Sequence, residues 1–199
     1  LFTDKFLGRG QQRALPDRPC CPHNAACGQI PSPRRPQADT LASMLTGDLL
    51  RRSSQRFPSK AAIIFRGGDG IRRVQSYAEL EASANRLAHA LLGLGLPKGA
   101  KVSVLSRNLL EYGAIFFGTA RTGLVLNNVS VLYAPDELAW VLHKSDTEAL
   151  LLDAAFLDKW NAIREQCSRV QRVIVIGASP EAALPPRSVH WSDFLAGQH

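Results

Sequence analysis

The sequence lacks the features that define several large classes of protein. No apolar run approaches the roughly 18 residues that a transmembrane helix needs, and apolar stretches such as residues 149–152 and 173–176 have the length of strands. Four cysteines in 199 residues do not make a disulfide scaffold in a chain of this length. We therefore expect no membrane bundle, collagen or coiled coil. A composition of 45% apolar and 21% charged residues is typical of a globular domain.

The excess of basic residues does not by itself indicate nucleic-acid binding. The 24 Lys and Arg against 17 Asp and Glu give a net charge of +7. Residues 1–39 hold six basic and three acidic side chains, which leaves 18 against 14 over residues 40–199. A nucleic-acid surface needs clustered Lys and Arg with interleaved aromatic residues, or a known reading module. Neither is present, so we expect no nucleic-acid partner.

Residues 1–39 differ in kind from the rest of the chain. They contain six of the twelve prolines and show no apolar periodicity, and proline both fixes φ and lacks an N–H donor. We expect this head to be disordered or foreign to the domain behind it, which we place at residues 40–199. The first residue is leucine rather than methionine, which also favours a foreign head. The head lacks the apolar core of a secretory signal, and we expect a cytoplasmic location.

The head also contains one cluster with the chemistry of metal ligands. Cys20, Cys21, His23 and Cys27 could offer soft ligands to zinc, but one tight group with adjacent cysteines differs from the two spaced pairs of known zinc modules. We therefore assign no metal site. Stoichiometric zinc in the purified protein would favour the alternative of a metal-binding regulatory head.

From about residue 40 onward, the pattern predicts strands alternating with helices. The clearest helix starts at Ser76-Tyr77-Ala78-Glu79, which has the form of a capping box, and continues with an apolar stripe at the spacing of helix turns. We expect helices over residues 41–56, 77–92, 108–121, 135–144 and 154–167, and strands over 61–65, 71–75, 101–105, 124–126, 148–152, 172–176 and 188–191. Because the later strands are apolar on both faces, we predict an α/β fold in which helices flank a parallel sheet, plus an N-terminal β-hairpin.

Motif searches identify no self-contained active site. The glycine-rich segment at residues 93–99 follows a helix and precedes a strand, whereas a phosphate cradle follows a strand and opens a helix. The sequence contains neither Gly-x-x-x-x-Gly-Lys-Ser/Thr nor Gly-x-Ser-x-Gly. We interpret His89 as a surface residue, His143 as complementing a helix dipole, and Cys167 as a core residue. We therefore assign no catalytic, cofactor-binding or metal-binding residue.

The middle of the chain as a whole is more informative than any motif within it. Its pattern over about residues 41–178 resembles the start of the adenylate-forming, AMP-binding synthetases, and within them the N-terminal lobe of the fatty-acyl-CoA synthetases. The resemblance is carried by Ser76–Leu80, Ala84–Ala88, Leu91–Gly95, Gly99–Val102, Asn108, Glu111-Tyr112, Ala120–Gly123, Asn128–Ala134 and Glu137–Leu142.

The resemblance implies an enzyme that activates a fatty or other carboxylic acid with ATP, through an acyl-adenylate, and passes the acyl group to coenzyme A. ATP, Mg²⁺ and CoA are implied for the full-length family. The family's Thr/Ser-Gly-Thr-Thr/Ser-Gly-x-Pro-Lys phosphate loop and its later catalytic lysine are absent from the 199 residues. We therefore expect an inactive N-terminal fragment that binds no cofactor alone and exposes an apolar face. The alternative is a non-catalytic α/β binding module.

Overall fold

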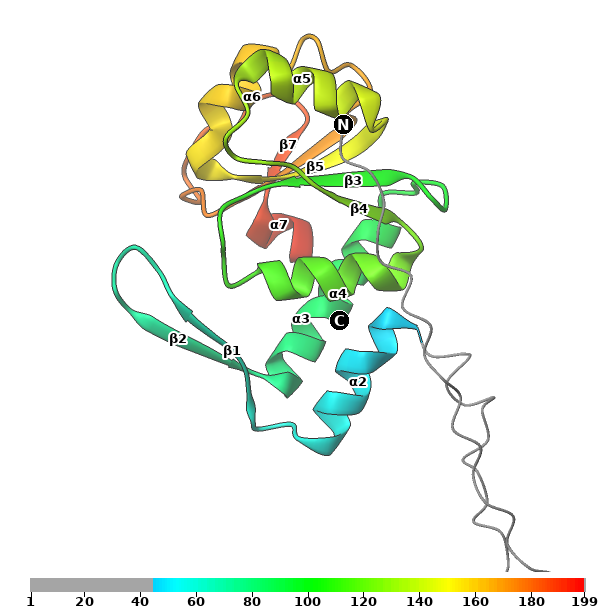
Figure 1. The fold of residues 1–199 in the computed structure, drawn as a ribbon, viewed down its shortest axis with the longest axis vertical. Helices are drawn as coiled ribbons and strands as arrows, with labels where there is room; N and C mark the ends of the chain where they lie inside the picture. The colour runs from blue at the N-terminus through cyan, green and yellow to red at the C-terminus, as the bar shows by residue number, and fades with distance from the viewer. Residues whose placement is uncertain (1–44, 199) are drawn as a thin grey trace, which may run out of the picture. The chain divides into compact units, whose positions relative to one another are not determined.

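The computed structural model describes residues 45–198 (Figure 1). The expected head, its zinc candidates and the predicted boundary between residues 39 and 40 lie outside the described residues. So do residues 41–44 of the helix predicted over residues 41–56. The helix α2 covers Thr46–Arg56, and Leu45 before it is an extended N-cap residue, so the prediction was wrong at that position.

Five parallel strands form the central sheet, in the order β4-β3-β5-β6-β7. They are β3 (Lys101–Leu105), β4 (Val125–Asn128), β5 (Thr147–Asp153), β6 (Arg172–Ile176) and β7 (Ser188–His190). The predicted parallel α/β class is thereby confirmed. Parallel neighbours cannot be joined by a tight turn, so each connection must cross a face of the sheet, and helices supply most of these crossovers.

Helices cover both faces of this sheet, as Figure 1 shows. On one face lie α3 (Tyr77–Leu92), α4 (Tyr112–Thr122) and α7 (Trp191–Leu195), and on the other lie α5 (Pro135–Lys144) and α6 (Leu157–Ile163). The alternation within β5 explains the two layers. Leu150 and Leu152 belong to the apolar cluster under α5 and α6, whereas Ala149 and Leu151 belong to the cluster against α3 and α4.

A further layer, made of α2 and an antiparallel hairpin, packs on α3 and α4. The hairpin consists of β1 (Ala61–Arg66) and β2 (Arg72–Ser76), and its turn contains Gly70 with φ of 72°. The α3 and α4 helices approach closely because Gly118 has no side chain: a Cβ there would lie 2.9 Å from the backbone oxygen of Ala84. The antiparallel pairing of β1 with β2 confirms the predicted N-terminal hairpin.

Capping residues in the sequence correctly predicted the ends of several helices. Ser76 and Glu79 form the predicted capping box, since the Ser76 N–H donates to Glu79 Oε2 at 2.7 Å and the Glu79 N–H donates to Ser76 Oγ at 3.3 Å. Pro135 opens α5, and Gly123 ends α4 with φ of 76°. Cys167 is buried in the core, as predicted.

Three expectations about helices were wrong. The helix predicted from residue 108 begins at Tyr112, because the Tyr112 N–H bonds to the Leu109 carbonyl in a separate turn. Asp153 caps the short 3-10 helix η1 (Ala154–Phe156) rather than α6, and α6 ends at Ile163, before Cys167. The expected turn at the chain's end is the helix α7, whose Trp191 side chain packs against the core.

Two neighbouring leucines on α3 test the assigned core. Leu91 is fully buried between α3 and the sheet, whereas Leu92 is exposed. Leu91→Ala should lower the free energy of unfolding by about 2–5 kcal/mol through lost burial and the cavity it leaves. Leu92→Ala, the matched control, should change that energy by no more than about 0.5 kcal/mol. Urea denaturation measures both, and equal effects of the two substitutions would contradict the packing described.

Candidate functional site

The first candidate site lies at the carboxyl edge of the sheet. In open parallel sheets of this strand order, ligands bind where the connections from two adjacent strands turn to opposite faces. Here that position lies between β3 and β5, since α4 and α6, which follow them, cover opposite faces (Figure 1). The residues at these two strand ends therefore decide what this edge can bind.

An ion pair joins the two strand ends. Arg107 Nε donates to Asp153 Oδ2 at 2.9 Å, and its terminal nitrogen donates to Oδ1 at 3.3 Å. The Asp153 side chain is 4% exposed and that of Arg107 is 61% exposed. Burial acts to raise the pKa of Asp153, but the bonds from Arg107 and from the Ala155 N–H outweigh it and hold that pKa below its ordinary value. The carboxylate is thus ionised at neutral pH and already bound within the fold.

Carboxylates also stand at the start of three helices that follow strands at this edge. Glu111 is the N-cap residue of α4, Glu137 Oε2 accepts from the Ala134 N–H at 2.8 Å at the start of α5, and Asp153 Oδ1 accepts from the Ala155 N–H at 3.0 Å at η1. A helix N-terminus binds phosphate through its positive dipole end and free N–H groups. Here Glu137 and Asp153 accept from N–H groups at two of these ends, whereas the Glu111 side chain makes no capping bond. The negative charge of these carboxylates would repel an added phosphate.

The glycine distribution leads to the same conclusion. The turn after β3, residues 106–111, contains no glycine that would let backbone N–H groups converge on an anion. The glycine-rich segment at residues 93–99 lies between α3 and β3, beside the amino ends of the strands, as the sequence predicted. The described residues at this edge therefore do not fit a nucleotide triphosphate or its magnesium ion.

The histidines are not gathered into a catalytic group. His89 and His143 are exposed on α3 and α5, and His143 lies in the last turn of its helix, as predicted. Nε2 of His190 lies 3.1 Å from the Ala182 carbonyl oxygen. His23 and His199 fall outside the described residues. Within residues 45–198, no three His, Cys, Asp or Glu side chains are arranged to hold a metal ion.

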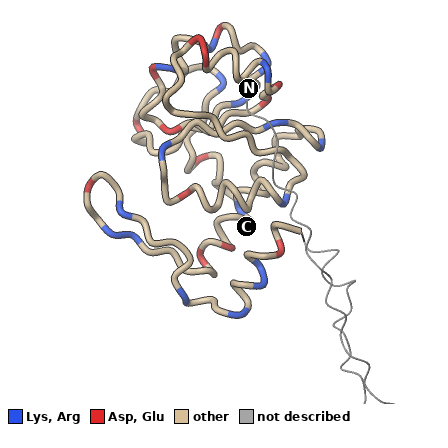
Figure 2. Tube along the Cα trace, in the orientation of Figure 1, with Lys and Arg blue, Asp and Glu red and all other residues tan. Residues whose placement is uncertain are grey.

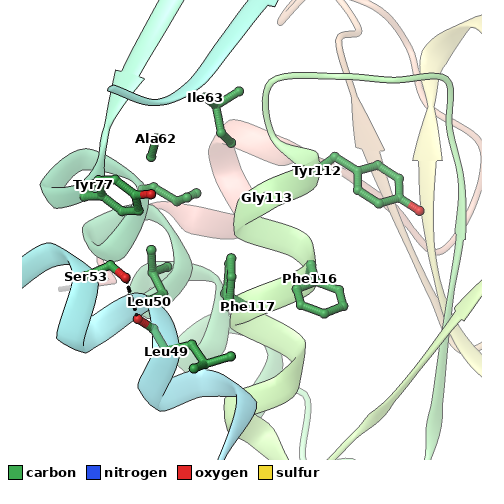
Figure 3. A pocket seen from close by; sticks show the side chains of 11 residues that line it. Leu49, Leu50, Ser53, Ala62, Ile63, Tyr77, Tyr112, Gly113, Phe116 and Phe117 are labelled. Carbon is green, nitrogen blue, oxygen red and sulfur yellow. Dashed lines mark hydrogen bonds between the residues drawn. The ribbon is translucent and has the colours of Figure 1, made fainter. Parts of the chain in front are cut away.

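The second candidate is an apolar groove of about 450 Å³ between α2, β1, α3 and α4 (Figure 3). Leu49 and Phe116 are exposed beside it, and the Ser53 hydroxyl near it is already used, donating to the Leu49 carbonyl at 2.9 Å. Burial raises the pKa of Tyr112, another lining residue, so its phenol stays protonated. The groove lining comprises Leu49, Leu50, Ser53, Ala62, Ile63, Tyr77, Leu80, Tyr112, Gly113, Phe116 and Phe117.

The groove offers burial of apolar surface rather than acid–base or phosphate chemistry. It is an exposed apolar face of the kind expected from the sequence, but sequence reasoning did not identify its residues. They come from four separate elements, so no single segment of the sequence contains the whole groove. No local signal could have grouped them.

Comparison with known proteins identifies the family. Residues 50–193 match the family described as AMP-binding enzyme. The chain belongs to the AMP-binding enzyme family. This confirms the resemblance drawn from the sequence. Over the residues that the structure describes, no helix is long and apolar enough to cross a membrane.

Individual relatives of this AMP-binding chain are CoA ligases. It is 32% identical over 129 residues to a medium/long-chain-fatty-acid–CoA/3-oxocholest-4-en-26-oate–CoA ligase of Mycobacterium marinum, covering 65% of this chain and 22% of that one. It is 31% identical over 122 residues to a crotonobetaine/carnitine–CoA ligase of Salmonella paratyphi B, covering 61% and 24%. An anthranilate CoA ligase solved with anthranoyl-AMP aligns with a TM-score of 0.67 and 26% identity, covering 78% of this chain and 28% of that one.

The chain spans about a quarter of the length of the curated relatives it matches.

In the described structure, Asn85 and Arg121, two residues that carry the family resemblance, connect helices. Arg121 on α4 bonds to Asn85 Oδ1, to Glu81 Oε2 at 2.6 Å on α3, and to the Gly47 carbonyl at 3.0 Å on α2. In this AMP-binding chain the contacts of Asn85 and Arg121 therefore hold α2, α3 and α4 together.

The ion pair at the sheet edge predicts a specific pH dependence. The folded-state pKa of Asp153 lies below the ordinary value of 3.8, so the pair stabilises the fold above that value. This contribution is lost as the pH falls through the lower folded-state pKa. Asp153→Asn keeps the cap and the shape but removes the charge, so it should destabilise the protein at pH 7 and progressively less below about pH 4.

Urea denaturation of both proteins across this pH range measures the effect. Glu181→Gln is the control, because Glu181 is an exposed carboxylate in no ion pair of the described residues. It should change the unfolding free energy by no more than about 0.5 kcal/mol at neutral pH. An Asp153→Asn difference that stays constant from pH 7 to acid would contradict the assigned role of the pair.

Proposed function

We propose that this chain is a scaffold lobe of an ATP-dependent acid–thiol ligase, which joins a fatty or other carboxylic acid to coenzyme A through an acyl-adenylate. The family match over residues 50–193 carries this proposal. The relatives differ in the acid their names give, yet each is a CoA ligase, so the shared element is a carboxylate joined to CoA. The proposal does not specify the acid. It includes a cytoplasmic location, where ATP and CoA are both available.

We further propose that the 199 residues alone do not catalyse the reaction. Adenylation requires the triphosphate charge to be neutralised by converging N–H groups, a cation and Mg²⁺. The sequence contains no Gly/Ser/Thr-rich phosphate loop, and the helix ends at the carboxyl edge already carry Glu111, Glu137 and Asp153. No residue of this chain is therefore given a catalytic, cofactor-binding or metal-binding role. ATP, Mg²⁺ and CoA would be bound by residues that this sequence does not supply.

The scaffold role fits the distribution of polar and apolar groups. The sheet is packed on both faces, and three of its polar side chains bond to one another: Ser103 Oγ lies 2.6 Å from Thr147 Oγ1, and Asn127 Nδ2 donates to Ser103 Oγ at 2.9 Å. Such satisfied groups fix the positions of neighbouring strands but are not free for chemistry. What the lobe offers outward is the apolar groove.

Release of pyrophosphate tests the proposal directly. The purified, folded 199-residue chain, given ATP, Mg²⁺, CoA and a panel of fatty acids, should release no more pyrophosphate than a heat-denatured sample. The crotonobetaine/carnitine–CoA ligase of Salmonella, assayed with its own substrates, shows that the assay reports such a reaction. ATP-dependent release by the isolated chain would overturn the scaffold role.

The coding sequence downstream of His199 tests the ligase part of the proposal. We expect an in-frame segment that encodes the Gly/Ser/Thr-rich phosphate loop. A stop codon with no such loop would contradict a ligase and would leave a non-catalytic α/β binding module as the function.

A further inference from the structure

The β1–β2 hairpin presents one face that nothing in the described structure covers. The antiparallel register places Ile64 opposite Val74 and Arg66 opposite Arg72. Residues two apart on a strand point to the same side, so these four side chains share one face, which we call the outer hairpin face. All four are exposed, with Ile64 at 61% and Val74 at 45%.

The charges on this face are unbalanced. Arg66 and Arg72 stand directly opposite each other, and like charges in that position repel. Neither forms an ion pair with any residue that the structure describes, and Arg66 reaches only the Gly70 carbonyl, at 3.4 Å. Arg73, on the other face of the same strand, is paired with Asp69 at 2.5 Å. The outer hairpin face therefore lacks the anion that its opposite face has.

The same face also leaves apolar surface in water. Ile64 and Val74 form a cross-strand pair of β-branched side chains, which can pack on each other, yet both remain exposed to water. Figure 1 shows the tip of the hairpin projecting from the helices, and Figure 2 shows its basic residues. A partner for this face must therefore offer both negative charge and an apolar interior, and it must be reachable by a projecting ribbon.

We propose that the outer hairpin face binds an anionic lipid surface. Arg66 and Arg72 pair with lipid phosphates, while Ile64 and Val74 enter the boundary between headgroups and acyl chains. A membrane surface supplies both the charge and the apolar environment that this face lacks. A polyanion such as RNA would satisfy the arginines but leave the Ile64–Val74 pair in water. The inference does not depend on ligase activity, because a catalytically inactive chain still presents this face.

Vesicle co-sedimentation of the full 199-residue chain tests the proposal. The protein should bind vesicles of phosphatidylcholine plus phosphatidylglycerol and should bind pure phosphatidylcholine much more weakly. Each basic residue near such a surface contributes about 1 kcal/mol, so Arg72→Gln should weaken binding about fivefold and the double variant Arg66→Gln/Arg72→Gln about 30-fold. Raising the salt from about 0.1 M to about 1 M should weaken wild-type binding, because the screening length falls from about 10 Å to about 3 Å.

Arg73→Gln is the matched control, since it makes the same substitution one residue away, on the opposite face of the strand. It should weaken binding by less than about twofold, because only charges facing the membrane contribute. Ile64→Ser should weaken binding to anionic vesicles while leaving the salt dependence unchanged. Thermal melting checks that all variants fold as the wild type does.

Three results would overturn the proposal. The first is equal binding to neutral and anionic vesicles, or no binding to either. The second is an equal loss of binding in Arg72→Gln and Arg73→Gln. The third is tighter binding to a single-stranded RNA oligonucleotide than to anionic vesicles, with no effect of Ile64→Ser, which would identify a nucleic-acid surface instead.

Discussion

Burial of the central strands on both faces is the constraint on which the rest of the described structure depends. Leu150, Leu151 and Leu152 of β5 are all fully buried, yet neighbouring side chains of a strand point to opposite sides. One strand therefore joins the helix layer of α5 and α6 to that of α3, α4 and α7. Each such side chain contributes about 1.5–3 kcal/mol relative to exposure, so the strand holds both layers in place.

At the carboxyl edge of this sheet, charged side chains are bonded within the fold rather than free to bind a ligand. The Arg107–Asp153 pair joins the strand ends where doubly wound sheets bind ligands, and carboxylates stand at the start of α4, α5 and η1. The fold family alone would suggest a nucleotide at this edge, but the side chains argue against it. The same electrostatic reasoning applies to the hairpin with the opposite sign, where two arginines lack any counter-charge within the described residues.

Much of the fold could be predicted from local signals. The predicted bounds of β3, α5 and β6 agree with the structure, because Pro135 fixes the first turn of α5 and the two strands are short segments rich in valine, leucine and isoleucine. The start of α4 was missed because the turn bond between Tyr112 and Leu109 replaced the expected cap. The helix α7 was missed because its five residues are too few to show a period, and packing of Trp191 against the sheet decides its structure.

The candidate sites were beyond sequence reasoning for a different reason. The absence of a phosphate loop is a property of the sequence, so the proposal that these 199 residues do not bind the nucleotide could be made from the sequence alone. The apolar groove and the Arg107–Asp153 pair depend on residues that are far apart in the chain and meet only in the fold. The outer hairpin face depends on strand register, since a shift of one residue would exchange Arg72 for Arg73 on that face.

We propose, above all, that this chain forms a scaffold lobe of a ligase and does not itself bind the nucleotide. Isothermal titration of Mg²⁺–ATP into the folded 199-residue chain tests it most directly. We expect no saturable binding at ATP concentrations up to about 1 mM, the upper end of the usual range of Michaelis constants. Saturable, magnesium-dependent binding with a micromolar dissociation constant would contradict it.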